Sequence, residues 1–462
     1  MVVQPFERRV RLPVDAEEAF AWHERPSALE RLTPPWERVE VVERAGEGLR
    51  PGTKVRLRTG LGPCAVEWEA EHRLREPGRR FVDVATRGPF ARWEHLHEFE
   101  NAEDGGCWLR DRVDYALPGG AVGRVLACPW VRRRLKRLFA YRQATTRDDL
   151  RFALDHRGAP ALRVWVSGAS GLIGRSLVPF LRGQGHQVIR LVRREARTSD
   201  EIAWDPETGS LGFGAADGVD AVVHLAGAGI AEGRWTPARR REIRESRVRG
   251  TALLAAALAA LPRPPRVVVG ASAIGFYGDA GEAWVDEASA GGGGFLAELT
   301  RDWEAAWAPL ERTGARRVYL RTGVVLSPAG GALAKMAPLF CVGLGGAVGG
   351  GRQWWSWISI DDMVGVIGHA LVEETLRGAV NAVAPTPVTN AGFARTLARV
   401  LGRPAVLPVP AWALRLVLGR ALADETLLAS QRVRPAALAA GGYRFRHQNL
   451  EAALRHVLGR VS

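Results

Sequence analysis

Lysine is nearly absent from this chain, although the chain is strongly basic. Its 64 Lys and Arg residues include only three lysines (Lys54, Lys136 and Lys335), and the net charge is +14. The arginines are spread along the sequence, whereas a nucleic-acid-binding face needs basic residues clustered with aromatic or glycine-rich modules. The densest basic run, Arg132–Arg137, has helical spacing and is interpreted as a solvated helix face. We therefore expect no nucleic-acid partner.

Recognisable metal or disulfide spacing is also lacking. The chain holds four cysteines: Cys64, Cys107, Cys128 and Cys341. They show no CxxC or zinc-like spacing, which favours reduced, structural thiols. The first third holds four histidines: His23, His72, His95 and His97. Because isolated histidines on strands are usually structural, no metal site is expected.

Long apolar runs are absent. The longest, Thr251–Leu261, is too short to span a bilayer and lies between Arg249 and Pro262, as a buried helix would. The first residues alternate charged with apolar side chains and lack the apolar core of a signal peptide. These absences predict a cytoplasmic protein without a membrane span.

Residues 1–155 alternate strand-like runs with turns. Alternation of apolar and polar residues, as in Trp93–Phe99, predicts an antiparallel sheet that is wetted on one face. Asp15 can cap a short helix over Ala16–His23, and a long helix over Val122–Leu154 closes the segment. The strands are expected at Phe6–Leu12, Glu37–Glu43, Lys54–Thr59, Cys64–Leu74, Arg80–Thr86, Trp93–Glu100 and Trp108–Ala116. Glycine and proline in residues 156–162 indicate a linker.

From residue 163 the pattern changes to short apolar strands separated by helical stretches. This order predicts an α/β fold with a doubly wound parallel sheet over residues 163–385, followed by a helical domain over 386–462. The strands are expected at Val164–Ser167, Gln187–Val192, Ala221–Leu225, Arg266–Gly270 and Arg317–Leu320. The helices between them are expected at Ile173–Gly183, Arg239–Leu261 and Phe295–Gly314.

A glycine-rich turn follows the first of these strands. Gly168 permits a tight turn, Gly171 lets backbone N–H groups approach a pyrophosphate, and Gly174 lets the helix pack close to the strand. The strand before and the helix after this turn are what separate a dinucleotide site from an ordinary glycine-rich turn. The expected cofactor contacts in the turn are Gly168, Ser170, Gly171, Leu172, Ile173 and Gly174.

Two arginines, Arg193 and Arg194, end the second strand about 20 residues past the last glycine, where the 2′-phosphate of NADP would bind. Because a guanidinium suits a phosphate monoester, we expect NADP(H) as the cofactor. Small residues after the third strand would let the backbone approach the cofactor, and they are Leu225, Ala226 and Gly227.

The motifs of the second region resemble the extended short-chain dehydrogenase/reductase superfamily. The closer resemblance is to its atypical branch of nucleoside-diphosphate-sugar epimerase-like proteins. The motifs are Trp204-Asp-Pro, Ser246-Arg-Val-x-Gly-Thr251, Ser272-Ala-Ile-Gly-Phe-Tyr-Gly278, Trp303-Glu304, Arg321-Thr-Gly-Val-Val-Leu326 and Gly350–Asp362. This resemblance covers nearly all of residues 162–462, because the motifs occur in order, and it implies NADP binding.

The first 155 residues resemble the SRPBCC (START-like) superfamily. The resemblance rests on Phe20–Pro26, Leu32–Trp36 and Gly88-Pro-Phe-x-x-Trp93, together with the long closing helix. It implies a helix-grip fold, in which a curved antiparallel sheet and the long helix enclose a cavity for an apolar ligand. We expect three tryptophans to line or wall that cavity: Trp22, Trp68 and Trp93.

The resemblance to the short-chain dehydrogenase/reductase superfamily implies three catalytic residues: a Ser or Thr, a Tyr and a Lys. The tyrosine transfers a proton, and the lysine lowers the pKa of the tyrosine. Ser272 stands where the serine is expected. Counting back from Glu304, however, puts Leu296 and Thr300 where the Tyr-x-x-x-Lys pair should be, and no such pair occurs in the chain. The candidate catalytic residues are therefore Ser272, Tyr277 and Glu304, with Arg247 as a substitute for the lysine charge near the ribose. Glu304 can instead cap a helix or pair with an arginine, and Tyr277 can be structural.

Two further segments have alternative interpretations. The tryptophans of Gln353–Trp357 can stack on a substrate sugar or ring, or can pack in the core. Asp361 and Asp362 are interpreted as the N-cap and first turn of a helix.

Three functions compete. The first is an NADP(H)-dependent oxidoreductase or epimerase-like enzyme that acts on a small-molecule substrate and carries a fused ligand-binding domain. The second is a catalytically silent NADP(H)-binding sensor or scaffold, which the missing Tyr-x-x-x-Lys favours. The third is a carrier of lipophilic ligands with a regulatory nucleotide-binding domain.

Overall fold

The structure is a computed structural model that describes residues 2–60, 65–212 and 218–460, with the backbone alone for residues 120–126. Cys64, where the fourth expected strand begins, lies outside these residues. The chain divides into two compact units. Unit 1 comprises Met1–Ala159, Arg182–Gly185 and Leu458–Ser462, and unit 2 comprises Pro160–Leu181 and His186–Val457. Each unit is described by itself.

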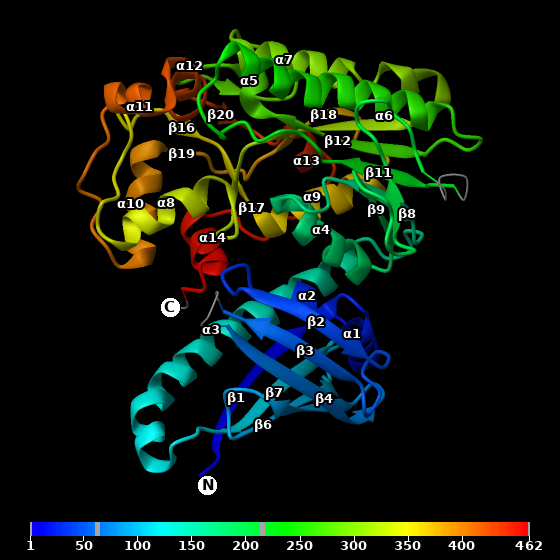
Figure 1. The fold of residues 1–462 in the computed structure, drawn as a ribbon, viewed down its shortest axis with the longest axis vertical. Coiled ribbons are helices and arrows are strands. Elements are labelled where there is room, and N and C mark those ends of the chain that lie inside the picture. The colour runs from blue at the N-terminus through cyan, green and yellow to red at the C-terminus, as the bar shows by residue number, and fades with distance from the viewer. Residues whose placement is uncertain (1, 61–64, 213–217, 461–462) are drawn as a thin grey trace. The chain divides into compact units, whose positions relative to one another are not determined.

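Unit 1 is built on a seven-stranded antiparallel sheet in the order β1-β7-β6-β5-β4-β3-β2 (Figure 1). The strands are β1 (Gln4–Leu12), β2 (Val39–Ala45), β3 (Lys54–Thr59), β4 (Val66–Glu76), β5 (Arg80–Arg87), β6 (Arg92–Asn101) and β7 (Cys107–Ala116). Residues of β6 and β7 alternate between buried and more exposed positions, so one face of the sheet meets the core and the other meets solvent.

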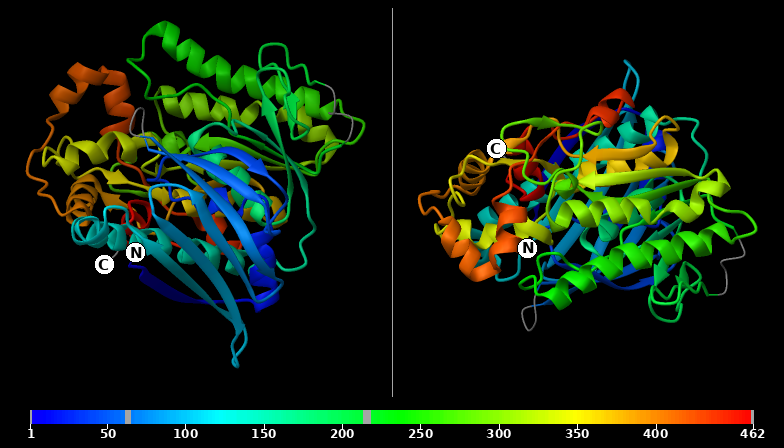
Figure 2. Two further views of the ribbon diagram at one scale, coloured as in Figure 1. Left: turned by 60° about the horizontal axis from the view of Figure 1, so that its bottom comes forward. Right: turned by 90° about the horizontal axis from the view of Figure 1, so that it is seen from above.

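Three helices complete this unit: α1 (Ala16–Glu24), α2 (Ala28–Arg31) and α3 (Gly120–Asp155). Asp15 caps α1 by accepting a hydrogen bond from Glu18 N, as predicted. The long α3 crosses one face of the sheet (Figures 1 and 2), where Phe139 packs 5.4 Å from Phe6. The sheet and helix together form a helix-grip domain.

Unit 2 contains a second seven-stranded sheet, all parallel, in the order β10-β9-β8-β11-β12-β14-β18. The strands are β8 (Arg163–Ser167), β9 (Gln187–Val192), β10 (Glu201–Ala203), β11 (Ala221–His224), β12 (Val267–Ala273), β14 (Arg316–Thr322) and β18 (Gly378–Ala382). Counted within this unit, the order is 3-2-1-4-5-6-7, the Rossmann arrangement with one more strand. The strand order reverses between β8 and β11, so ligands are expected at the carboxyl ends of these two strands.

Helices cover both faces of this sheet (Figures 1 and 2). They are α4 (Leu172–Gly183), α5 (Pro237–Arg244), α6 (Gly250–Ala259), α7 (Phe295–Ala305) and α9 (Ile360–Val372). The helix expected over Arg239–Leu261 is interrupted by a π-helical segment, Glu245–Arg249, and the one expected over Phe295–Gly314 ends in a 3-10 turn, Ala308–Thr313. Two of the strands, β10 and β18, were not expected.

Shorter elements make up the rest of unit 2. The helices are α8 (Gly331–Cys341), α10 (Asn390–Leu401), α11 (Ala411–Leu418), α12 (Arg420–Leu422), α13 (Ala436–Ala440) and α14 (Leu450–Val457). The short strands are β13 (Trp284–Val285), β15 (Val324–Leu326), β16 (Trp354–Trp355), β17 (Trp357–Ser359), β19 (Val388–Thr389) and β20 (Arg432–Val433). Within the described residues, every helix is too short or too polar to cross a bilayer.

Candidate functional site

The glycine turn joins β8 to α4 at the point where the strand order reverses. Gly168 has a φ of +69°, and a Cβ there would lie 2.8 Å from the carbonyl carbon of Leu225 in the loop after β11. A Cβ on Gly174 would meet the Gly168 carbonyl oxygen and lie 2.6 Å from Ala169 Cα. The absence of side chains at these two positions therefore lets the turn, the neighbouring loop and the start of α4 pack at backbone contact.

The loop after β11 contains Gly227, and the guanidinium of Arg247 lies beside it. A Cβ on Gly227 would be 3.2 Å from the guanidinium carbon of Arg247. Arg247 comes from the π-helical segment before α6, is 7% exposed and lies over the ring of Trp303 at 5.1 Å. Its guanidinium donates from Nη1 to the Ile243 carbonyl at 3.3 Å, and its Nε finds no partner among the described residues.

Burial and the nearby Arg239 lower the pKa of Arg247 to about 10. The guanidinium is therefore still charged at neutral pH, and no carboxylate among the described residues pairs with it. A buried cation without an anionic partner is costly. Because it lies beside the loop after β11, Arg247 is a candidate contact for an anionic group of a bound ligand.

The two arginines after β9 differ in what they contact. Arg194 forms two hydrogen bonds to the carboxylate of Glu201, at 2.7 and 2.8 Å. Arg193 is exposed and forms no ion pair with any described residue. Arg193 is thus the arginine of the pair whose guanidinium is available to a phosphate. Arg175, which the sequence argument passed over, donates from Nε to the Ser170 carbonyl at 2.6 Å and so lies against the glycine turn.

The three candidate catalytic residues form one buried network at the carboxyl ends of β12 and β14. Ser272 Oγ donates to Glu304 Oε1 at 2.6 Å. Arg321 binds both oxygens of Glu304 at 2.9 Å and donates to the Tyr277 hydroxyl at 3.2 Å. That hydroxyl in turn donates to Asn381 Oδ1 at 2.8 Å. Ser272, Tyr277 and Glu304 therefore lie together, as a catalytic group would.

Within this network, the negative charge of Glu304 is compensated by the positive charge of Arg321. Glu304 forms a bidentate pair with Arg321, so the predicted alternative in which Glu304 pairs with an arginine is the one that the structure forms. The guanidinium carbon of Arg321 also lies 3.4 Å from the centroid of the Phe276 ring. Burial raises the pKa of Tyr277, and Arg321 offsets only part of that rise. A phenol whose pKa is raised is poorly suited to act as the tyrosinate base at neutral pH. Sequence reasoning missed Arg321 and Asn381, because their pairing crosses strands far apart in sequence.

The tryptophans of Gln353–Trp357 are anchored in the protein. Trp355 and Trp357 are buried, and the Nε1 of each donates to a backbone carbonyl, that of Leu427 at 3.3 Å and that of Thr386 at 3.0 Å. Trp354 donates to Glu282 at 2.7 Å and stacks on Arg432. These contacts favour packing over stacking on a substrate.

The acidic pair that begins α9 is placed differently from the expectation. The N-cap is Ser359, whose hydroxyl accepts from Asp362 N, so both Asp361 and Asp362 lie in the first turn. Asp362 accepts hydrogen bonds from the backbone N–H groups of Arg446 and His447. A carboxylate used in this way ties the C-terminal segment to the helix and is structural.

The fold and the turn define a class: a Rossmann-type dinucleotide-binding fold joined to a helix-grip domain. Residues 164–382 match the NAD dependent epimerase/dehydratase family, residues 12–139 match the family of polyketide cyclase/dehydrase and lipid transport, and residues 409–457 match a domain of unknown function. The chain belongs to the NAD-dependent epimerase/dehydratase family.

Individual relatives agree with this assignment. The chain is 45% identical over 297 residues to an epimerase family protein of Mycobacterium bovis, covering 64% of this chain and 98% of the relative. A solved nucleoside-diphosphate sugar epimerase from Corynebacterium glutamicum superposes with a TM-score of 0.80 at 35% identity, over 98% of this chain and 90% of that one. Human epimerase family protein SDR39U1, solved with NADPH, gives a TM-score of 0.61 at 37% identity, over 65% of this chain and 100% of that one.

Proposed function

We propose that unit 2 binds NADP(H) and that the chain is an NADP(H)-dependent oxidoreductase or epimerase-like enzyme acting on a small molecule. The observation that most supports NADP(H) binding is the buried guanidinium of Arg247, which pairs with no described carboxylate. It lies beside the loop after β11, next to the glycine turn. Support comes from the human relative solved with NADPH. The substrate is a compound that places a carbonyl or carbinol near Ser272. The cytoplasmic location stays a prediction from the sequence.

The pyrophosphate would lie over the turn at Gly168–Gly174, where the N-terminus of α4 supplies backbone N–H groups and partial positive charge. Arg247 would pair with a negatively charged group of the bound molecule, which relieves the cost of burying an uncompensated cation. Arg193, being exposed and unpaired, would contact the 2′-phosphate that distinguishes NADP from NAD.

Binding of reduced cofactors tests this assignment. Purified full-length protein should change the fluorescence of NADPH at lower concentrations than that of NADH. Arg193→Ala should weaken NADPH binding about tenfold or more and leave NADH binding nearly unchanged, since one charged hydrogen bond contributes about 1.5–3 kcal/mol. Arg194→Ala is the matched control, because Arg194 is already held by Glu201. Tighter binding of NADH than of NADPH would exclude NADP(H) as the cofactor.

A specific observation supports the second function, a silent NADP(H)-binding sensor. The hydroxyl of Tyr277 and the carboxylate of Glu304 are both held by Arg321, and no Tyr-x-x-x-Lys pair is present. Turnover separates the two functions. Oxidation of bound NADPH by any member of a panel of carbonyl compounds and nucleotide sugars supports the enzyme, whereas binding without oxidation across the panel supports the sensor.

The third function, a carrier of lipophilic ligands, depends on the N-terminal unit. Its match to a family of polyketide cyclases and lipid transport supports an apolar ligand. Of its expected cavity tryptophans, Trp22 and Trp93 are buried in core clusters, and Trp68 packs edge-on against Trp93 at 4.9 Å. Native mass spectrometry of the full chain should show a co-purified apolar molecule if the unit is a carrier, and none if the interior is filled by side chains alone.

A further inference from the structure

The inner face of the sheet in unit 1 carries a belt of charged side chains between two apolar clusters. One cluster includes Phe20 and Phe99, and the other includes Trp93 and Phe139. Between them lie Asp83 on β5, His95 and His97 on β6, and Asp111 on β7, of which the two histidines and Asp111 are less than 10% exposed. Burying titratable groups in an apolar interior is costly unless something compensates their charge.

The strand register explains how these residues come together. Side chains two apart on a strand share a face, so His95 and His97 both point inward. In the ladder, His95 pairs with Asp83 and His97 pairs with Asp111. The histidine pair can be seen in the sequence as His-x-His, but the carboxylates come from two other strands. The prediction that these histidines are structural rested on spacing along the chain, which does not show residues brought together from different strands.

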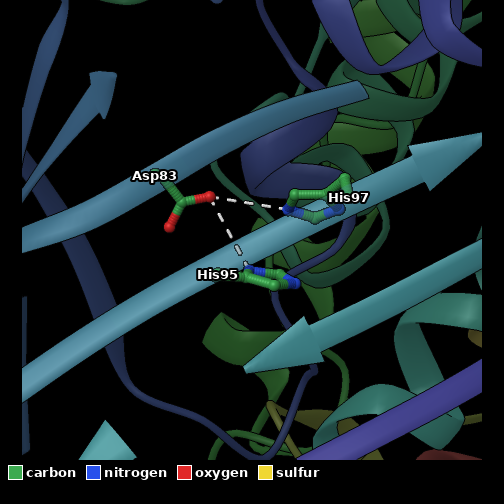
Figure 3. A group of neighbouring side chains, drawn as sticks. All are labelled: Asp83, His95 and His97. Atoms are coloured by element: carbon green, nitrogen blue, oxygen red, sulfur yellow. Dashed lines mark ion pairs between the residues drawn. The ribbon is translucent and has the colours of Figure 1, made fainter. Parts of the chain in front are cut away.

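Three side chains turn one ligand atom each toward a common point (Figure 3). The atoms lie within 4.8 Å of one another, and the residues are Asp83, His95 and His97. Asp83 Oδ1 is 3.7 Å from His95 Nδ1 and 3.5 Å from His97 Nε2. These are ion-pair distances, and they also lie near the distance of about 3.4 Å between two ligands of a tetrahedral cation whose bonds are about 2.1 Å.

Asp111 contacts the opposite nitrogen of each ring. Its Oδ1 is 3.3 Å from His95 Nε2 and 3.0 Å from His97 Nδ1. Asp111 is itself held from α3 by Gln143 Nε2, which donates to Oδ2 at 2.7 Å. A carboxylate behind a metal-binding imidazole fixes the tautomer and orients the ring. Here one carboxylate stands behind both rings and leaves the nitrogens on the Asp83 side for a ligand.

The rings are also fixed by packing. Phe81 stacks flat on His97, with centroids 4.0 Å apart and an interplanar angle of 16°, and Phe139 meets His95 edge-on at 5.1 Å. The buried His23 and the half-buried Arg142 and His72 also interact electrostatically with residues of this belt.

We propose that Asp83, His95 and His97 form a binding site for one divalent first-row transition cation, of which zinc is the first candidate, inside the helix-grip unit. Two imidazole nitrogens and one carboxylate oxygen form a donor set that such cations accept. Three protein ligands leave at least one position of a four-coordinate cation for water or for a ligand of the domain. Asp111 acts as a positioning residue behind both histidines.

The test uses the full-length chain, stripped with a chelator and titrated with Co²⁺ or Zn²⁺ alone. We expect one equivalent per chain by elemental analysis after desalting, and intense visible absorption of the Co²⁺ form, typical of low coordination number. Asp83→Asn and His97→Gln, each close in shape to the residue replaced, should weaken binding at least tenfold. Asp111→Asn should weaken it less and alter the Co²⁺ spectrum.

His456→Gln is the matched control, because His456 faces Asp361 at 3.3 Å in the other unit and offers the same chemistry outside the site. Circular dichroism and the thermal midpoint of each stripped variant show whether it is folded. Folded variants of Asp83 and His97 that bind Co²⁺ as tightly as the unmodified chain would overturn the proposal. A folded, stripped, unmodified chain that binds neither ion would overturn it equally, and would leave the belt as an ionic network closed by protons and Arg142.

Discussion

Two buried arginines in neighbouring regions of unit 2 differ in how their positive charge is compensated. Around Arg321, the carboxylate of Glu304, the hydroxyl of Tyr277 and the ring of Phe276 satisfy the guanidinium within the protein. Around Arg247, one long hydrogen bond to a carbonyl and the ring of Trp303 are the contacts formed, and no described carboxylate faces it. Described residues therefore compensate the charge of Arg321, whereas none compensates the charge of Arg247. We therefore expect an anion to be stabilised beside Arg247 and to be stabilised little beside Arg321.

The largest effect is expected at Arg321. Arg321→Ala leaves Glu304 buried without its partner, and breaking a buried pair in this way costs about 3–5 kcal/mol of the free energy of unfolding. Urea unfolding followed by circular dichroism measures this loss. Arg317→Ala, which removes an arginine paired with the exposed Glu311, is the control and should cost about 1 kcal/mol or less. Equal losses for the two variants would show that the Arg321 network is not a closed, stabilising unit.

A methyl group in the glycine turn should have the next largest effect. Gly174→Ala places a Cβ against the Gly168 carbonyl and Ala169 Cα, and such overpacking costs about 1–3 kcal/mol. NADPH binding, measured by fluorescence, should weaken by about tenfold or more because the turn must shift. Gly250→Ala is the control, since a Cβ on this helical glycine meets nothing within 4 Å. Unchanged NADPH binding by Gly174→Ala would separate the turn from the cofactor site.

Arg247 should behave in the opposite sense to Arg321. Arg247→Met removes a buried cation that lacks a partner, so the free energy of unfolding should stay the same or rise. NADPH affinity should nevertheless fall about tenfold or more, since a hydrogen bond to a charged group contributes about 1.5–3 kcal/mol. Unfolding by urea and NADPH titration together check the two signs. A loss of stability comparable to that of Arg321→Ala would remove the contrast between the two regions.

The last effect is a dependence of stability on pH, which we expect from His224, the final residue of β11. Burial lowers the pKa of His224 from 6.5 to about 4, so between these values the unfolded chain binds a proton that the folded chain does not. Stability therefore falls as the pH drops from 6.5 toward 4, by up to about 1.4 kcal/mol per pH unit for this residue. His224→Asn should show a shallower slope than the unmodified chain in unfolding titrations across this range. Parallel slopes would show that His224 does not titrate in this way.

Local patterns in the sequence were sufficient for most of the fold. The strands at Lys54–Thr59 and Gln187–Val192 were predicted to the residue, and the cap at Asp15 and the turn at Gly168–Gly174 followed from local chemistry. The short β10 (Glu-Ile-Ala) and the late β18 (Gly-Ala-Val-Asn-Ala) were missed because each contains only one of the β-branched or aromatic residues that are enriched in strands. The cap of α9 at Ser359 was also missed, although Ser359 and Asp362 have the local spacing of a capping box and bond to each other.

The two kinds of sheet, the nucleotide-binding turn and the absence of the Tyr-x-x-x-Lys pair could all be predicted from the sequence, because each depends on residues that are close together along the chain. The partners of the charged groups, in contrast, depend on how the chain folds in three dimensions. Glu304 pairs with Arg321, and Arg247 has no acidic partner among the described residues. Asp83 lies beside His95 and His97 because strand register brings together residues from different strands. Electrostatic compensation depends on distance in space, and spacing along the chain does not specify that distance.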